Sequence, residues 1–285
     1  MTDAPRLFCF GLGYSARVLA RSLAAQGWSI AGTARDPSQA DTEFPLHRFD
    51  RAHPLDDPSR VLAGVTHVLI SVPPDEIGCP VFDMHGCDLP APQGLRWLGY
   101  LSTTNVYGDH GGGWVDETTP VAPSGERGRR RVVAETAWLS VSSLPAHVFR
   151  LAGIYGPGSN TLVSLKAGKA RRTVKPGQVF SRIHVDDIAT VLQASMRRTH
   201  PGAIYNVCDD EAAPPEDVVA YGASLLGIAP PPLEDFATAT LSPMARSFYE
   251  DNKRVANRRI KEELGVTLRY PTYREGLRAL LASDG

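Results

Sequence analysis

Residues 6–17 read RLFCFGLGYSAR and contain the pattern that decides the fold. A short apolar run ends at Gly11, and a helical pattern with one apolar face follows from Tyr14. Gly11, Gly13 and Ala16 form a G-x-G-x-x-A array between the two. The first glycine permits a tight turn, the second lets a pyrophosphate approach the backbone, and the alanine lets the helix lie close to the sheet. The stretch predicts a dinucleotide-binding unit; the alternative is that the glycines serve only a turn.

The end of the second predicted strand indicates which nucleotide is bound. Sites for NAD usually place an acidic residue there, which accepts a hydrogen bond from the ribose 2′-hydroxyl. In this chain the stretch reads GTARDP, so Arg35 would pair with a 2′-phosphate and Thr33 would add a hydroxyl donor. Asp36 is the neighbouring residue and could instead serve as the acid of an NAD site. We therefore predict NADP, with NAD as the alternative.

The remaining predicted cofactor contacts come from the first helical turn and from two later strands. Backbone N–H groups at a helix N-terminus bind phosphate, which points to the turn that begins at Tyr14. Asp50 ends the third predicted strand and is a candidate adenine contact, or else a simple cap of that strand. The predicted cofactor-binding residues are Gly11, Gly13, Tyr14, Ser15, Ala16, Thr33, Arg35, Asp50 and Val72.

Strand and helix patterns alternate through the first half of the chain, which predicts a parallel sheet with helices on both faces. The regularity weakens after about residue 155. We predict an α/β fold in which residues 1–154 form a doubly wound parallel sheet of Rossmann type. A smaller C-terminal substrate lobe then occupies residues 155–285, and about 180–207 returns to the sheet. Individual predictions include a long loop over 73–94, helices over 127–141, 215–226 and 253–264, and one strand over 145–156.

Composition excludes several classes of function. The chain has 285 residues, a formal net charge of -1 and a pI of about 6.7, so it is not a general nucleic-acid binder. No apolar run approaches the roughly 20 residues of a membrane helix, and the N-terminus does not resemble a signal peptide. Four cysteines are too few for a disulfide framework in a chain of this size. We expect a cytoplasmic protein that binds a small molecule, with no nucleic-acid or membrane partner.

A series of motifs resembles one superfamily. These motifs are LSTTNVYGD (101–109), DETTPVAP (116–123), FRLAGIYGPG (149–158), RIHVDDIA (182–189), AIYNV (203–207) and a tail over 252–277. In this order they resemble the extended short-chain dehydrogenase/reductase superfamily, which includes NAD-dependent epimerases and dehydratases. The phosphate loop is most similar to the atypical branch. The resemblance covers nearly the whole chain and implies an NAD(P)-binding oxidoreductase or a nucleotide-sugar epimerase/dehydratase-like protein. It also allows a homodimer.

The resemblance assigns catalytic positions, but the family's catalytic pair is missing. Thr103, four residues before Tyr107, matches the hydroxyl that orients a substrate oxygen. The family pair is Y-G-x-x-K followed by a glutamate, whereas this chain reads RGRRRVVAE. With Glu135 as the register mark, Arg127 stands where the tyrosine belongs and Arg131 where the lysine belongs. The candidate catalytic residues are therefore Thr103, Tyr107, Arg127 and Arg131.

Arginine changes the chemistry available at these positions. Its pKa lies above about 12, so Arg127 cannot exchange a proton as the family tyrosine does. Arg131 could still hold the nicotinamide ribose, and the guanidinium groups suit an anionic substrate. Arg129 and Arg130, on the same predicted helix, could equally face water. Tyr107 is the nearest other phenol, although the resemblance implies a structural role for it.

Other titratable residues supply weaker alternatives. His110 precedes GGG, a loop that could act as a lid, and Asp116 and Glu117 follow it. His184 is expected to be a buried structural histidine. The stretch CPVFDMHGCD offers the side chains of Cys79, Asp83, His85 and Cys87, but its spacing matches no standard zinc pattern, so no metal is expected.

Two functions are consistent with this sequence. The first is an NAD(P)-dependent enzyme with a remodelled active site, acting on a small and anionic substrate. The second is a non-catalytic NADP-binding protein that senses redox state or binds a partner. The intact cofactor loop favours the first, and the missing tyrosine and lysine favour the second.

Overall fold

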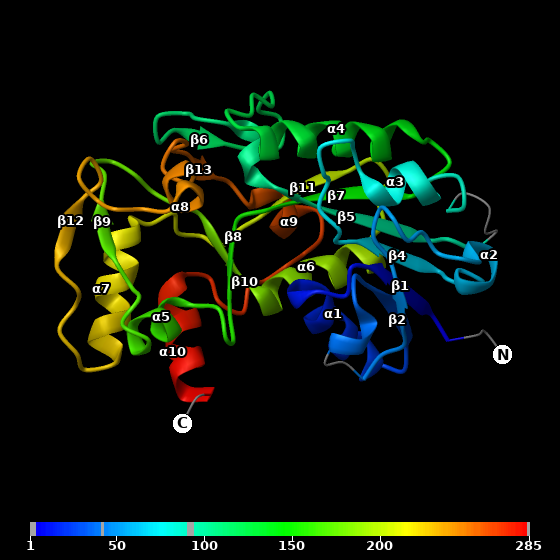
Figure 1. Ribbon diagram of the computed structural model, residues 1–285, viewed down its shortest axis with the longest axis horizontal. Helices are drawn as coiled ribbons and strands as arrows, with labels where there is room; N and C mark the ends of the chain where they lie inside the picture. Colours follow the sequence, from blue (N-terminus) through cyan, green and yellow to red (C-terminus); the bar gives the residue numbers. More distant parts are fainter. Residues whose placement is uncertain (1–3, 41–42, 90–93, 284–285) are drawn as a thin grey trace. The chain divides into compact units, whose positions relative to one another are not determined.

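The computed structural model describes residues 4–40, 43–89 and 94–283 (Figure 1). Its main sheet has seven strands, as the alternating pattern of short apolar runs predicts. These are β1 (Arg6–Phe10), β2 (Ser29–Ala34), β3 (Leu46–Arg48), β4 (His67–Ile70), β5 (Trp97–Thr103), β7 (Ala146–Leu151) and β11 (Ile204–Val207). The spatial order is β11-β7-β5-β4-β1-β2-β3. The predicted doubly wound α/β sheet is confirmed.

The order of the strands reverses direction at β1. The chain runs outward from β1 to β2 and β3, then returns to place β4 on the other side of β1. The pairings of β1 with β2 and β4, of β2 with β3, and of β4 with β5 are all parallel. Sheets of this kind bind ligands at the carboxyl ends of the strands beside such a reversal. The glycine loop that follows β1 lies at this point.

Helices cover both faces of the sheet, with α4 and α3 on one face and α1 and α6 on the other (Figure 1). The strands are therefore buried on both sides, and β1, β4 and β5 consist almost entirely of residues with little or no exposure. Trp138 of α4 packs edge-to-face against Phe82 of α3 with ring centroids 4.9 Å apart. The helices of this part are α1 (Tyr14–Ala24), α2 (Pro58–Val61), α3 (Pro80–His85), α4 (Glu126–Ser140) and α6 (Val185–Arg197).

The remaining strands form three pairs outside the main sheet. These are β8 (Gly153–Tyr155) with β10 (Arg182–His184), β9 (Arg172–Val174) with β12 (Leu233–Asp235), and β6 (Trp114–Val115) with β13 (Arg254–Val255). The helices that accompany them are α5 (Thr161–Lys166), α7 (Pro215–Leu225), α8 (Pro243–Ser247), α9 (Arg258–Glu262) and α10 (Tyr273–Ser283). Helices α5, α7 and α10 share an apolar cluster that includes Leu162, Val218 and Leu277.

The chain divides into two compact units. Unit 1 contains residues 1–103, 126–150 and 188–205, and unit 2 contains 104–125, 151–187 and 206–285. The segment 104–125 thus leaves the predicted domain 1–154, because its strand β6 pairs with β13 near the C-terminus. A two-residue strand of this kind has no recognisable pattern in the sequence.

Three local predictions differ from the structure. The predicted loop over 73–94 contains α3, which begins at Pro80, where the fixed φ of proline suits the first helical turn. The predicted single strand over 145–156 is two strands, β7 and β8, which belong to different sheets. The helix predicted over 253–264 begins as β13 and becomes helical only at Arg258.

Candidate functional site

The glycine loop between β1 and α1 is held to the end of β2. Gly11 has φ +86°, a left-handed conformation that glycine adopts without strain, and a Cβ there would lie 3.1 Å from a methyl group of Val72. Its backbone N–H donates a hydrogen bond of 2.8 Å to the hydroxyl of Thr33. The N–H of Leu12 donates to the carbonyl oxygen of Thr33, also at 2.8 Å. Thr33 is 1% exposed, so both of its hydrogen bonds to the loop come from a buried residue.

Gly13 serves a different purpose from Gly11. It is the N-cap of α1 with φ -87°, a value open to any residue, and a Cβ there would have no atom within 4 Å. Neither backbone conformation nor packing therefore requires glycine. No side chain caps this helix, and its first turn has no acidic residue. The open space at Gly13 and the uncapped N-terminus fit an anionic ligand from outside the chain.

Asp36, the acidic residue next to Arg35, accepts hydrogen bonds from residues of its own turn. One carboxylate oxygen of Asp36 accepts from the backbone N–H of Ser38 at 3.0 Å and from its hydroxyl at 2.6 Å. The other accepts from the amide of Gln39 at 2.7 Å. The hydrogen bonds from Ser38 lower the pKa of Asp36. Arg35 is exposed, and its guanidinium has no hydrogen bond or ion pair within the described part of the chain.

The other predicted cofactor residues lie on the same unit. Tyr14 and Ser15 begin α1, with Tyr14 41% exposed and Ser15 buried. Asp50 accepts hydrogen bonds from the backbone N–H groups of Ala52 and His53, so it caps the turn after β3. Its contact with adenine stays a prediction.

Thr103 and Tyr107 belong to different units, and each has a distinct environment. Thr103 is half-buried at the end of β5. Tyr107 is fully buried, and its hydroxyl donates a hydrogen bond of 2.7 Å to the side-chain oxygen of Asn206. The backbone N–H of Asn206 in turn donates to Glu117 at 2.7 Å. The phenol of Tyr107 is therefore held inside unit 2 by Asn206, and both its structural role and its catalytic role stay predictions.

Arg127 and Arg131, which stand at the family's catalytic positions, differ in exposure and in contacts. Arg127 is exposed and has no hydrogen bond or ion pair among the described residues. Arg131 is half-buried and lies against β5, where its guanidinium donates to the carbonyl oxygen of Leu101 and, at 3.2 Å, to the hydroxyl of Tyr100. Arg131 therefore braces α4 against the sheet, whereas the Arg127 side chain is open to solvent.

A buried ion pair fixes the same helix, and the sequence did not reveal it. Glu135 of α4 and Arg150 of β7 are each 4% exposed and lie 2.7 Å apart at their closest charged atoms. The hydroxyl of Ser102 on β5 donates to Glu135 as well. In the sequence, Glu135 is recognisable only as the glutamate that follows the family's catalytic pair. Its position directly over the end of β5 makes it part of the scaffold of the candidate site.

The remaining predicted residues have structural partners. Arg129 pairs with Glu126 on the same helix, and Arg130 lies 3.6 Å from Glu76. His184 is 1% exposed and accepts from the backbone N–H of Asp186 at 3.2 Å.

The loop that contains His110 is hydrogen-bonded to a later segment of the chain. The backbone N–H groups of His110 and Gly112 both donate to the carbonyl oxygen of Asn252, and the backbone N–H of Asn252 donates to Asp109. The stretch around Cys79 also has its own contacts, since Asp83 pairs with Arg51. Across residues 4–40, 43–89 and 94–283, no three His, Cys, Asp or Glu side chains are grouped so that they could hold a metal ion.

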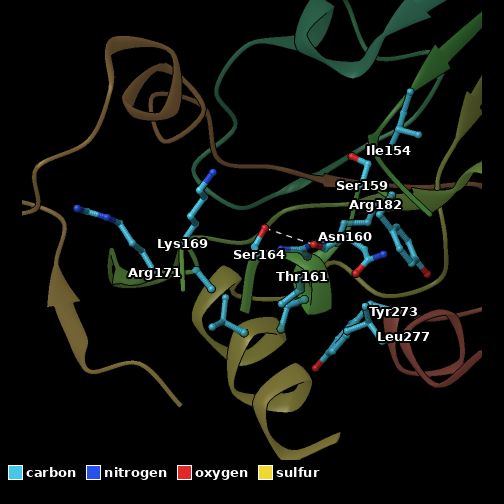
Figure 2. Close-up of a pocket in the computed structure, with 14 residues that line it drawn as sticks. Ile154, Ser159, Asn160, Thr161, Ser164, Lys169, Arg171, Arg182, Tyr273 and Leu277 are labelled. Atoms are coloured by element: carbon cyan, nitrogen blue, oxygen red, sulfur yellow. Dashed lines mark hydrogen bonds between the residues drawn. The ribbon is translucent and has the colours of Figure 1, made fainter. Parts of the chain in front are cut away.

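Unit 2 contains a polar pocket of about 420 Å³ (Figure 2). Figure 2 shows Asn160, Thr161 and Ser164 of the α5 region at its centre, with Lys169 and Arg171 on one side and Arg182 and Tyr273 on the other. None of its lining residues is acidic. The residues that line it are Ile154, Tyr155, Ser159, Asn160, Thr161, Ser164, Lys169, Ala170, Arg171, Arg182, Val218, Val219, Tyr273 and Leu277.

The cations of this pocket differ in how well they are paired. Arg171 lies 3.4 Å from Glu234, and Arg182 donates to the backbone oxygens of Phe180 and Ala213. Lys169 is exposed and has no ion pair or hydrogen bond from its ammonium group in the described part of the chain. The pocket therefore presents net positive charge together with hydroxyl and amide groups.

Comparison with known proteins relates the whole chain to solved structures. A structure from Silicibacter pomeroyi, named a functionally unknown conserved protein, is 56% identical with a TM-score of 0.92, over 98% of this chain and 99% of the other. A Methylobacillus flagellatus structure named "putative NAD-dependent epimerase/dehydratase" is 26% identical, with a TM-score of 0.77 over 99% and 98%. Protein YeeZ of Escherichia coli K12 is 28% identical over 275 residues, or 92% of this chain and 94% of YeeZ.

A more distant structure shares the fold alone. MoeE5 in complex with UDP-glucuronic acid and NAD is 18% identical with a TM-score of 0.79, over 99% of this chain and 100% of MoeE5.

No family model matches the chain. No helix in the described ranges is long and apolar enough to cross a membrane.

Proposed function

Because the chain belongs to the extended short-chain dehydrogenase/reductase superfamily, we propose that it binds NADP at the glycine loop and acts as an oxidoreductase or epimerase/dehydratase-like enzyme. Its substrate is a small molecule that carries a hydroxyl or carbonyl group and an anionic group. The observation that carries the proposal is the open, uncapped N-terminus of α1 at Gly13. When bound, the nicotinamide supplies or accepts a hydride.

The preference for NADP over NAD rests on Arg35 and Asp36. Both oxygens of Asp36 are engaged by Ser38 and Gln39, so an NAD ribose would have to compete with those hydrogen bonds. The exposed guanidinium of Arg35 has no competing partner in the described residues and suits a 2′-phosphate. Thr33 holds the loop through its hydrogen bonds with Gly11 and Leu12, and the first turn of α1 binds the pyrophosphate.

A pair of fluorescence titrations, with NADPH and with NADH, tests the cofactor. We expect NADPH to bind at least about tenfold more tightly, and Arg35→Ala to remove that difference, since a lost charge-assisted contact costs about 1.5–3 kcal/mol. Arg60→Ala is the matched control, because Arg60 is also exposed and lies on α2. Equal binding of both nucleotides to the wild type would contradict the NADP assignment, and binding of neither would contradict the enzyme proposal.

The pocket of unit 2 is the proposed site for the anionic part of the substrate. Lys169 supplies an unpaired positive charge, and Thr161 and Ser164 supply hydroxyl groups. Nucleotide sugars are one candidate class, because MoeE5 binds UDP-glucuronic acid. In a calorimetric titration with UDP-glucuronic acid, Lys169→Ala should weaken binding about tenfold. The control is Lys166→Ala, since Lys166 lies on α5 outside the pocket. An equal effect of both changes, or no binding to the wild type, would reject this assignment.

A second function is favoured by the surroundings of the candidate proton donors. The hydroxyl of Tyr107 is buried against Asn206, and Arg127 cannot act as a base at neutral pH. A non-catalytic NADP-binding sensor or partner-binding protein would need neither a proton donor nor a base. The double variant Arg127→Tyr/Arg131→Lys separates the two functions, with Arg129→Tyr as control on the same helix. Activity that appears only in the double variant indicates the sensor, whereas native turnover that this variant abolishes indicates the enzyme.

A further inference from the structure

A second cavity lies in unit 1, at the edge of the sheet opposite the glycine loop. Pro5 precedes β1, His67 begins β4 and Arg96 precedes β5, so the cavity opens at the amino ends of these parallel strands. The glycine loop follows the carboxyl end of β1. The cavity measures about 490 Å³, a size typical of small-molecule sites. Its lining residues are Pro5, Leu23, Gln26, Trp28, His67, Arg96, Gln193, Met196, Arg197 and Thr199.

The cavity has an aromatic and apolar floor. The rings of Trp28 and His67 have centroids 4.6 Å apart, and Trp28 is half-buried, so part of the indole is accessible. Leu23 is 2% exposed and adds an aliphatic surface, and Met196 is half-buried. A flat aromatic ligand suits such a surface, since aromatic pairs stack with centroids about 4.5–7 Å apart.

One ring nitrogen of His67 lacks a partner within the described part of the chain. The hydroxyl of Thr66 donates to the carbonyl oxygen of Arg6 at 3.1 Å and lies 2.8 Å from Nδ1 of His67. Nδ1 therefore carries the proton and donates, which leaves Nε2 as an acceptor. His67 is 5% exposed, and burial lowers its pKa to about 4, so the ring is neutral at physiological pH. A ligand N–H or O–H group would satisfy Nε2.

Two arginines supply the charge of this cavity. Arg96 and Arg197 are both exposed, and neither guanidinium has an ion pair or hydrogen bond to a described residue. Among residues 4–40, 43–89 and 94–283, no acidic side chain lines the cavity. Gln26 and Gln193 are already hydrogen-bonded to each other at 2.8 Å. The free positive charge favours a carboxylate, which accepts two parallel hydrogen bonds from one guanidinium.

We propose that this cavity is a second ligand site, which binds a small aromatic carboxylate that also carries an N–H or O–H donor. The ring lies on Trp28 and Met196, the carboxylate pairs with Arg96 and Arg197, and the donor reaches Nε2 of His67. The site is separate from the proposed cofactor loop and does not depend on the proposed function.

Indole-3-acetate is a suitable probe, because it has a planar ring, one N–H donor and one carboxylate. The protein is labelled with ¹⁵N at its four tryptophan indoles, and the resonance of Trp28 is identified from its loss in Trp28→Phe. We expect indole-3-acetate to shift this resonance with a dissociation constant of about 1 mM or tighter. The neutral analogue indole-3-acetamide should bind at least about tenfold more weakly.

Charge-removing variants test the arginines directly. Arg96→Gln and Arg197→Gln should each weaken indole-3-acetate about tenfold or more, while Arg198→Gln should leave it unchanged. Arg198 is exposed and adjacent in sequence but does not line the cavity. The proposal is overturned if the acid and the amide bind equally, if all three variants behave alike, or if about 10 mM probe leaves Trp28 unshifted. NADPH affinity, measured on the same variants, should not change.

Discussion

The hydroxyl of Thr33 accepts a hydrogen bond of 2.8 Å from the backbone N–H of Gly11, and this bond joins the end of β2 to the loop after β1. The two residues are 22 positions apart, and the acceptor is well protected from solvent, since Thr33 is 1% exposed. The shape of the proposed phosphate site therefore depends on a residue that we expected to contact the cofactor itself. Its role as a cofactor donor stays a prediction.

Replacement of Thr33 tests this support. Thr33→Val keeps the volume but leaves the N–H of Gly11 without an acceptor, so we expect a loss of about 1–3 kcal/mol in the free energy of unfolding. NADPH affinity should fall as well. Thr33→Ser retains the hydroxyl and should restore most of both quantities. Urea unfolding and NADPH titration measure the two effects, and an unchanged Thr33→Val protein would show that the bond is dispensable.

The two glycines of the loop should respond differently to alanine. Gly13→Ala adds a Cβ where no atom lies within 4 Å, so stability should hardly change while NADPH affinity drops at least about tenfold. Gly11→Ala forces a positive φ and a close contact with Val72, so the protein itself should lose about 1–2 kcal/mol. Thermal unfolding and NADPH titration of both variants separate the effects. Unchanged affinity in Gly13→Ala would argue against a pyrophosphate at this position.

Much of the main sheet could be predicted because its signals are local. The strand β1, the glycines and the amphipathic helix α1 follow one another within 20 residues, and each has a recognisable pattern. The split of 145–156 into β7 and β8 could not be predicted, because residues 151–156, LAGIYG, include no charged residue or proline that would mark the end of one strand. The short strand β6 exists only through its pairing with β13, about 140 residues later.

Residues of the candidate site could be proposed from the sequence, but their contacts could not. The motif spacing points to Gly11 and Gly13, and the end of the second predicted strand points to Arg35; their roles in cofactor binding stay predictions. The cap formed by Asp36 could have been found, since aspartate two residues before serine favours such turns. The pair of Glu135 with Arg150 could not, because it joins a helix to a strand whose register depends on tertiary packing.

That buried pair gives a prediction about stability. Glu135→Ala would leave the guanidinium of Arg150 without a countercharge in a site that is 4% exposed, and we expect a loss of about 3–5 kcal/mol. Glu135→Leu combined with Arg150→Met removes both charges and should be far less harmful than the single change. Denaturant unfolding of the three proteins provides the test. A double variant that is destabilised as much as Glu135→Ala, or more, would show that the loss does not come from the charge left on Arg150.

Asp209 of unit 2 gives a prediction about pH. It is 3% exposed, one of its oxygens has no hydrogen-bond partner among the described residues, and burial raises its pKa to about 8. In the unfolded chain the pKa is about 3.9, so between about pH 4 and pH 8 the folded state holds a proton that the unfolded state has released. Stability therefore falls as the pH rises through this window, by up to about 1.4 kcal/mol per unit.

Substitution of Asp209 should remove that dependence. Asp209→Asn cannot ionise, so its free energy of unfolding relative to the wild type should increase by about 2–4 kcal/mol between pH 5 and pH 8. Asp56→Asn is the matched control, because it makes the same substitution at an exposed aspartate. Urea unfolding at pH 5, 6, 7 and 8 measures the difference for each protein. A constant difference between Asp209→Asn and wild type would mean that the folded protein already holds Asp209 as a carboxylate at pH 5.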